Sequence, residues 1–163
     1  MFDISNFTVA DMTACGKLIR DLESKSNSVE AVASSLVSLL YNNFTSQKTN
    51  EKDFVLARFG LTISDVIKPD RSIQIEKENK GFNVFYVPDA KGSKFIPMQE
   101  EFVVPFGIES VLGFGGRQPN GDVFAIIIFS KTHIPEAAAM MFKTISLSVK
   151  AAILMFDNQV FET

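Results

Sequence analysis

The sequence predicts an α+β domain, in which an antiparallel sheet of about five to six strands carries the N- and C-terminal helices on one face. Two observations predict this class. Apolar residues recur at helical spacing near both chain ends, over 8–44 and 137–156. Between them lie short apolar or alternating runs that end at Gly, Pro or Asn, as strands joined by turns do. Helices segregated from the strands along the chain favour α+β over a doubly wound sheet.

The first helix is predicted over Thr8–Ser24, because Asp11 stands three residues after its first residue, in the pattern of a capping box. A second helix is predicted over Val29–Phe44, where apolar residues again mark one face. Its N-cap is either Asn27 or Ser28, since both side chains can accept a hydrogen bond from the first turn.

Five stretches read as strands, because each is apolar or alternating and ends near a turn residue. They are Phe54–Leu61, Asn83–Val87, Glu101–Val104, Ile108–Gly115 and Val123–Ser130. The last two are separated by a turn cluster rich in Pro, Asn and Gly and are predicted to form a hairpin. The segment between the second and third strands is predicted to be irregular.

The closing helix, Ala137–Phe156, is apolar most of the way round. Such a helix is covered on more than one side. One side is expected to pack on the sheet, and the other either on the N-terminal helices or on a second subunit. The candidate residues of a subunit interface are Phe142, Ile145, Val149, Ile153 and Phe156.

Length and composition limit the classes of function. The 163 residues, 46% of them hydrophobic, suffice for one core, so we expect a single domain over 1–163. A net charge of −3 predicts neither nucleic acid nor an anionic membrane as partner. The lone cysteine, Cys15, excludes an internal disulfide and favours a reducing, cytoplasmic setting. Lys143 and Lys150 interrupt the one long apolar stretch, so no membrane span is expected.

No catalytic, metal or cofactor site is predicted. The glycines of Gly113-Phe114-Gly115-Gly116 precede another strand, whereas a phosphate-binding loop leads into a helix N-terminus, so hairpin geometry explains them. The only histidine, His133, lies at a strand-to-helix junction and is expected at the surface. No Gly-x-Ser-x-Gly nucleophile motif is present. We therefore expect a protein that is not an enzyme.

Several short patterns carry a family resemblance. Strand, turn and helix-start motifs follow one another as Gly107-Ile108-Glu109-Ser110, Asn120-Gly121-Asp122 and Ile134-Pro135-Glu136. This order resembles the C-terminal half of a GAF domain, the profilin-like, small-molecule-sensing module of bacterial signalling proteins, over roughly Phe82–Phe156. The runs from Asn83 to Pro88 and from Phe95 to Phe102 are similar to a GAF-like subfamily. That subfamily stands at the N-termini of sensor histidine kinases of two-component systems and of cyclic-dinucleotide signalling enzymes.

The resemblance implies a cytoplasmic sensor domain that relays a signal through its end helices to a covalently linked output domain, as a homodimer. It also implies a ligand between the sheet and the irregular middle segment. The residues expected to bind this unknown small molecule are Phe85, Tyr86, Phe95, Met98, Phe102, Ser110, Phe114 and Arg117, with Gln99 and Ser93 as further polar candidates. Two alternatives stay open: these aromatic residues simply form the core, and the domain is a ligand-free dimerisation or scaffolding module.

The sequence also departs from specialised members of that family. Positions 45–163 contain no cysteine for covalent bilin attachment, and one cysteine cannot supply the disulfide relay of a GAF-type methionine sulfoxide reductase. The Asn-Lys-Phe-Asp-Glu signature of cyclic-nucleotide-binding GAF domains is absent as well. The resemblance therefore implies a sensor whose ligand is of another kind.

Overall fold

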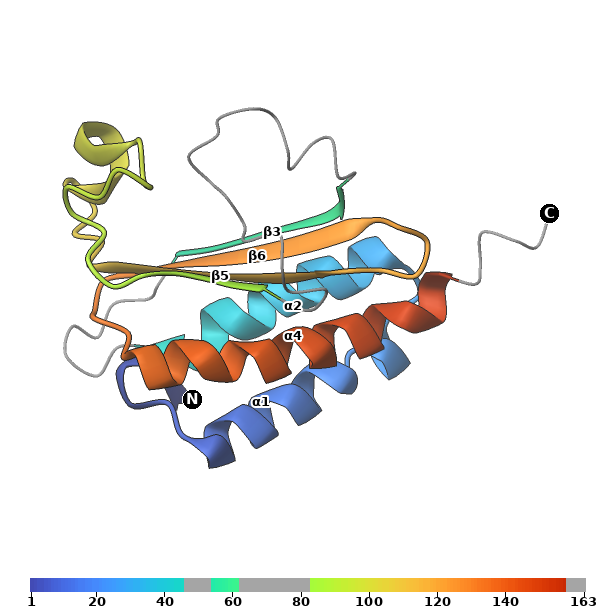
Figure 1. Cartoon of the computed structure of the whole chain (residues 1–163). Helices are drawn as coiled ribbons and strands as arrows, with labels where there is room; N and C mark the ends of the chain where they lie inside the picture. The colour runs from blue at the N-terminus through green and yellow to red at the C-terminus, as the bar shows by residue number, and fades with distance from the viewer. Residues whose placement is uncertain (46–53, 62–82, 158–163) are drawn as a thin grey trace.

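The computed structural model describes residues 1–45, 54–61 and 83–157. They form an α+β arrangement built on a four-stranded antiparallel sheet, in the order β3-β6-β5-β4. Helices α2 and α4 lie against one face of this sheet, and α1 packs along α4 (Figure 1). The segment 88–109 rises on the opposite side of the sheet (Figure 1). The predicted α+β class is confirmed.

The two N-terminal helices begin where local capping predicts. Helix α1 spans Val9–Arg20, and the capping box forms in full: Thr8 Oγ1 accepts from the Asp11 N–H at 3.2 Å, and Asp11 Oδ2 accepts from the Thr8 N–H at 3.0 Å. Helix α2 spans Val29–Asn43, and Ser28, not Asn27, caps it by accepting from the Ala31 N–H at 3.2 Å. Helix α1 ends four residues earlier than predicted, and a short 3₁₀ turn follows it.

Three of the predicted strands have the predicted bounds: β3 Phe54–Leu61, β4 Asn83–Val87 and β6 Val123–Ser130. The predicted strand Ile108–Gly115 is found as β5, which spans Ser110–Arg117 and pairs with β6 as the predicted hairpin. A further pair of very short strands, β1 and β2, forms a separate parallel ladder that joins the N-terminus to the end of α2. Their bounds are Phe2–Asp3 and Phe44–Thr45.

The prediction of a strand over Glu101–Val104 is wrong, and the sheet has four strands among the described residues instead of five to six. Glu101, Phe102 and Val103 belong to a π-helical turn, η3, over Gln99–Val103, and Val104 is its C-cap. The Val103 N–H donates to the Met98 carbonyl oxygen at 3.1 Å, an i→i+5 bond that closes the turn. Gly107, at φ +63°, then turns the chain towards β5.

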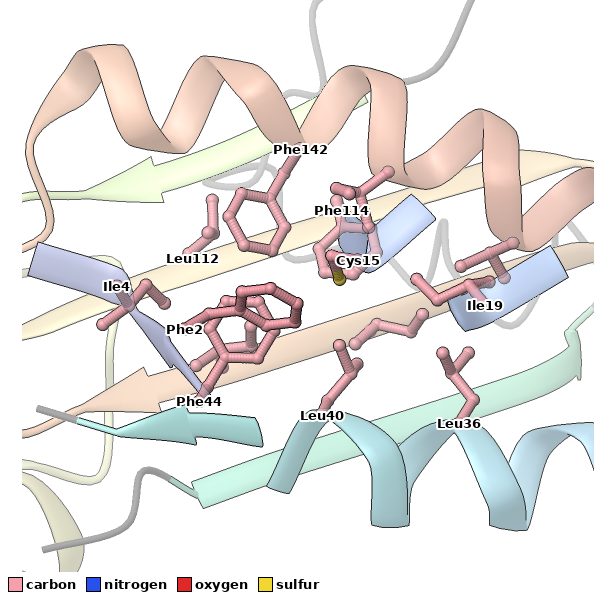
Figure 2. Close-up of a cluster of buried hydrophobic side chains, with 14 of the residues drawn as sticks. Phe2, Ile4, Cys15, Ile19, Leu36, Leu40, Phe44, Leu112, Phe114 and Phe142 are labelled. Atoms are coloured by element: carbon pink, nitrogen blue, oxygen red, sulfur yellow. The ribbon is translucent and has the colours of Figure 1, made fainter. Parts of the chain in front are cut away.

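Two apolar clusters hold the sheet between them. The inner cluster lies between the sheet and the helices, where the rings of Phe7, Phe44 and Phe114 surround Phe142 at centroid distances of 5.2–5.8 Å. Figure 2 shows part of this cluster, including Phe44, Phe114 and Phe142. The outer cluster lies on the opposite face, beneath the segment 88–109. Its members are Val87, Ala90, Ile96, Val103, Ile108 and Val111, with Phe85, Phe102, Ile127 and Phe129 packed against them.

Helix α4 spans Glu136–Asp157, and its buried face corrects the predicted subunit interface. Phe142, Ile145, Val149 and Ile153 are at most 1% exposed within this one chain, and Phe156 packs beside them. The sheet and α1 cover the first four of these side chains, so those four are not available to a partner, whereas Phe156 is half-buried. Of the two alternatives for this face, packing within the chain describes it.

Helix α4 corrects the premise of the expectation about membrane spans, that no stretch of the chain is long and apolar enough. By length and composition alone, its residues Glu136–Phe156 would suffice to cross a membrane. Core helices often share these properties, and α4 packs on the sheet and on α1 in this structure.

Candidate functional site

Two open hollows flank the loop that follows β4. The Tyr86 hollow has a volume of about 370 Å³. It is lined by Tyr86, Val87, Pro88, Asp89, Lys91, Gly92, Ser93, Lys94 and Phe95. The His133 hollow has a volume of about 320 Å³ and is lined by Pro88, Asp89, Lys91, Val103, Gly107, Ile108, Glu109 and His133. Because both hollows share Pro88, Asp89 and Lys91, the loop 88–95 forms a common wall.

The side chain of Gln99 holds this loop in shape. Its Oε1 atom accepts from the Gly92 N–H at 2.8 Å, and Gly92 takes φ +71°, which glycine adopts without strain. Its Nε2 atom lies 2.7–3.3 Å from three loop carbonyl oxygens, those of Ala90, Ser93 and Ile96. Gln99 was expected to orient a ligand, but the structure assigns its polar atoms to the loop backbone.

Tyr86 connects its hollow to the start of α4. Its side chain lines the hollow, and its hydroxyl donates a hydrogen bond to the carbonyl oxygen of Ile134, two residues before α4 begins. Burial raises the pKa of Tyr86, and the carboxylates of Glu136 and Asp89 raise it further. The phenol therefore keeps its proton at neutral pH and remains a donor.

Ser110, the first residue of β5, also binds the junction that leads into α4. Its buried hydroxyl donates to the Thr132 carbonyl oxygen at 2.6 Å and accepts from the Ile134 N–H at 3.2 Å. Ile134 thus has its N–H bound by a side chain of β5 and its carbonyl by a side chain of β4. Both strands therefore set the direction in which the chain enters α4.

The structure does not bring the eight predicted ligand-binding residues together, because they divide between the two faces of the sheet and the surface. Tyr86 and Phe95 line the Tyr86 hollow, and Ser110 lies at the junction. The side chain of Phe114 is in the inner cluster, and those of Phe85 and Phe102 are in the outer cluster. Met98 and Arg117 are exposed at different places, on the turn before η3 and at the end of β5.

Alternation along a strand explains part of this division. Neighbouring residues such as Phe85 and Tyr86 point to opposite faces of a sheet, so they cannot line one pocket. The charged residues Asp89, Lys91 and Lys94, which do line the Tyr86 hollow, were not among the predicted residues. The turn-like run Pro88-Asp89-Ala90-Lys91-Gly92 directly after a strand was the one sequence signal that pointed to them.

His133 is exposed at the junction between β6 and α4, where the sequence predicted a surface residue. It lines the His133 hollow together with the carboxylates of Asp89 and Glu109. Within the described ranges, however, no three His, Cys, Asp or Glu side chains are grouped closely enough to hold a metal ion. The hollow is therefore a mixed-charge surface rather than a coordination site in this part of the chain.

No protein-family model matches this chain, and no curated protein matches it either.

Proposed function

We propose that this chain is a regulatory sensor domain of the GAF-like kind, which binds a small molecule in the Tyr86 hollow. In this proposal, occupancy of the hollow is relayed through α4 to an output domain. The observation that carries the proposal is the position of Tyr86. One side chain forms part of the hollow and also holds the residue from which the chain enters α4.

The proposed relay is a shift between two packing states of α4. A ligand that contacts the phenol ring changes the free energy of the state in which the hydroxyl bonds to Ile134 relative to the state in which it does not. Only such a difference in affinity can move the equilibrium between two conformations. Ser110 holds the other side of the Ile134 peptide, so a movement there is transmitted to the first turn of α4.

The layered arrangement supports the GAF-like assignment. Helices cover one face of the antiparallel sheet, and the irregular segment 88–109 covers the other, as the resemblance implies. The hollows lie along this irregular segment, where a GAF-like domain would hold its ligand.

A thermal-shift screen against nucleotides, amino acids and organic acids, followed by native mass spectrometry, tests the proposal. A ligand that binds only the folded state stabilises it by about 2.7 kcal/mol at a hundred times its dissociation constant. We expect a ligand that raises the melting temperature and is seen as bound mass, with weaker binding to Phe95→Ala. If no compound gives both signals, the sensor proposal fails.

A second candidate function, a dimerisation module, is favoured by the solvent-exposed side of α4. Met140, Leu147 and Leu154 are spaced seven residues apart and are 37%, 50% and 36% exposed. With Thr144 and Ala151 between them, they repeat alternately every four and three residues, as the seam of a coiled coil does.

A second copy of the chain, aligned in parallel, suits this stripe. In that pairing Lys143 and Lys150 occupy flanking positions, where neither lysine faces a lysine of the other copy. The stripe differs from the predicted interface, whose residues, Phe156 apart, are buried in the core.

A cysteine at Ala151 tests the dimer directly, because a parallel seam brings this position next to itself. We expect Ala151→Cys to form a disulfide-linked dimer under mild oxidation and Leu147→Glu to run as a monomer in light scattering. Leu18→Glu, at an exposed leucine of α1, is the matched control. A monomeric native protein rules out this candidate and leaves the sensor proposal standing.

A further inference from the structure

Ser93 is the lining residue of the Tyr86 hollow whose hydrogen bonds are best defined. Its carbonyl oxygen accepts from Gln99, as do those of Ala90 and Ile96, which do not line the hollow. The Ser93 hydroxyl oxygen accepts from the Phe95 N–H at 3.3 Å, which leaves its proton to be donated. Ser93 can therefore offer a donor to a ligand.

The charged side chains that line the hollow include more cations than anions. Lys91 and Lys94 bring two ammonium groups to the lining, and Asp89 brings one carboxylate. The Asp89 carboxylate contributes to the raised pKa of Tyr86. Lys94 Nζ lies 5.3 Å from the ring centroid of Phe95. One of the two ammonium groups is therefore beside an aromatic surface.

Phe95 is 42% exposed although it is a large apolar ring. A flat apolar group that covered it would remove this surface from water, and an aromatic ring there would gain an offset or edge-on contact. The hollow volume of about 370 Å³ is near the lower end of the range for small-molecule sites, about 300–1,000 Å³. A ligand with one ring fits that size.

We propose that the Tyr86 hollow takes a small aromatic carboxylate, with its carboxylate group at Lys91 and Lys94 and its ring against Phe95. The proposal rests on the sensor function proposed above and names the chemical class of its ligand. Lysine ammonium groups act as point charges on an anion, and the Ser93 hydroxyl adds a directional donor.

The test uses benzoate, phenylacetate and 4-hydroxyphenylacetate, each compared with its own uncharged amide. Each compound is titrated into isotope-labelled protein while the backbone amide signals of residues 91–95 are followed by NMR. We expect at least one acid to shift these signals and to bind at least about five-fold more tightly than its amide. Binding should weaken as salt is raised to about 1 M, where the Debye length is about 3 Å.

Two variants locate the charge that is responsible. Lys94→Ala is expected to weaken binding of the acid about two- to five-fold, an effect in the range of exposed ion pairs. Lys17→Ala, which removes an exposed lysine of α1, should leave the affinity unchanged. Inorganic phosphate, which has charge but no ring, should bind more weakly than the best acid if Phe95 contributes.

Each contrary result overturns the ligand class. The proposed ligand class is wrong if acid and amide bind with equal affinity, or if no acid binds. It is also wrong if the signal shifts are confined to other parts of the chain. The sensor function fails separately, when the wider screen finds no ligand of any class. A neutral or cationic ligand found in that screen, and mapped to residues 86–95, would support the sensor while refuting the carboxylate proposal.

Discussion

The hydroxyl of Tyr86 on β4 donates a hydrogen bond to the carbonyl oxygen of Ile134, and this bond joins the edge of a surface hollow to the entry of the longest helix. The side chain of Ile134 is fully buried, so its backbone cannot move without disturbing the inner cluster. A contact made at the surface is thereby linked to a residue of the core.

Replacing Tyr86 with Phe removes this bond and retains the ring. We expect the free energy of unfolding to fall by about 1–2 kcal/mol, the cost of leaving a part-buried acceptor unsatisfied. Hydrogen exchange in the first turn of α4 should become faster. Ser93→Ala, which removes another hydroxyl from the same hollow, is the control and should leave α4 unchanged. Equal exchange rates in the wild type and Tyr86→Phe would contradict the coupling.

Gln99→Glu is expected to loosen the loop in a pH-dependent manner. The introduced carboxylate would face three carbonyl oxygens in place of the amide donor, at a cost of about 2 kcal/mol near neutral pH. The same oxygens disfavour its charged form, so its pKa in the folded state is raised above the unfolded value of about 4.3.

The sign of this pH dependence follows from linkage. Stability contributed by a group with a raised folded pKa is present below its unfolded pKa and is lost as pH rises through the folded pKa. The deficit of Gln99→Glu relative to the wild type should therefore shrink in acid. Urea denaturation at about pH 4 and pH 7 measures it, with Glu100→Gln at the exposed neighbouring position as control. A deficit that is constant with pH would refute the bonding assigned to Gln99.

Two of the three glycines of β5, Gly113 and Gly115, should differ sharply in their tolerance of alanine. A Cβ atom on Gly115 would lie 2.3 Å from the Phe124 carbonyl oxygen, which belongs to the backbone of β6. Ser146 of α4 also donates to the Gly115 carbonyl oxygen at 2.8 Å, which limits movement of the strand. We expect Gly115→Ala to cost about 2–3 kcal/mol of unfolding free energy, as overpacked sites do.

Gly113→Ala is the matched variant on the same strand. Its Cβ atom would meet Phe85 at 3.4 Å, a distance that a side chain can accommodate, so we expect a change within about 1 kcal/mol. Thermal or chemical denaturation of both variants decides the comparison. Equal losses would show that the strand position, and not the close approach to Phe124, sets the cost.

Cys15 is expected to be inert in the folded protein. Burial raises the pKa of its thiol to about 12, and the charge of Asp11 adds to the shift. A thiol that is protonated at neutral pH is a poor nucleophile, so Ellman's reagent should react slowly with the native chain and rapidly in urea. Fast reaction of native protein would show that α1 opens readily from the inner cluster.

The same shift predicts a loss of stability in alkali. Below the unfolded thiol pKa of about 8.5, the contribution of the protonated thiol to the free energy of unfolding is complete. As pH rises towards the folded pKa of about 12, this contribution is lost by up to about 1.4 kcal/mol per pH unit. Cys15→Ala should lack this part of the decline. Unfolding free energies measured between about pH 8 and pH 10.5 would reveal it as a difference in slope between the two proteins.

The agreement between sequence and structure is closest where the deciding hydrogen bond is local. The capping box of Thr8 and Asp11 lies within four residues, and α1 begins there. Likewise β4 and β6 have their predicted ends, because alternation and flanking turn residues are properties of the segment itself. The GAF-like resemblance was read from such short patterns and stays a proposal.

Two predictions failed for different reasons, one because of side-chain bonds to a neighbouring loop and one because of packing between distant elements. Glu101–Val104 has the composition of a strand, but the turn around Gln99 closes on the preceding loop. The apolar faces of α4 could not be ranked from its sequence. The sheet and α1 bury the face with Phe142 and leave the face with Leu147 exposed.

By itself, the sequence determined the α+β class, the starts of the helices and the bounds of most strands, since these follow from spacing and capping along the chain. The tertiary structure alone decided which side chains meet. Phe114 and Tyr86 were predicted in one pocket, yet Phe114 packs against Phe142 at 5.2 Å while Tyr86 bonds to Ile134. A site is made where strands, loop and helix converge, and that convergence depends on how the faces of each element are buried against one another.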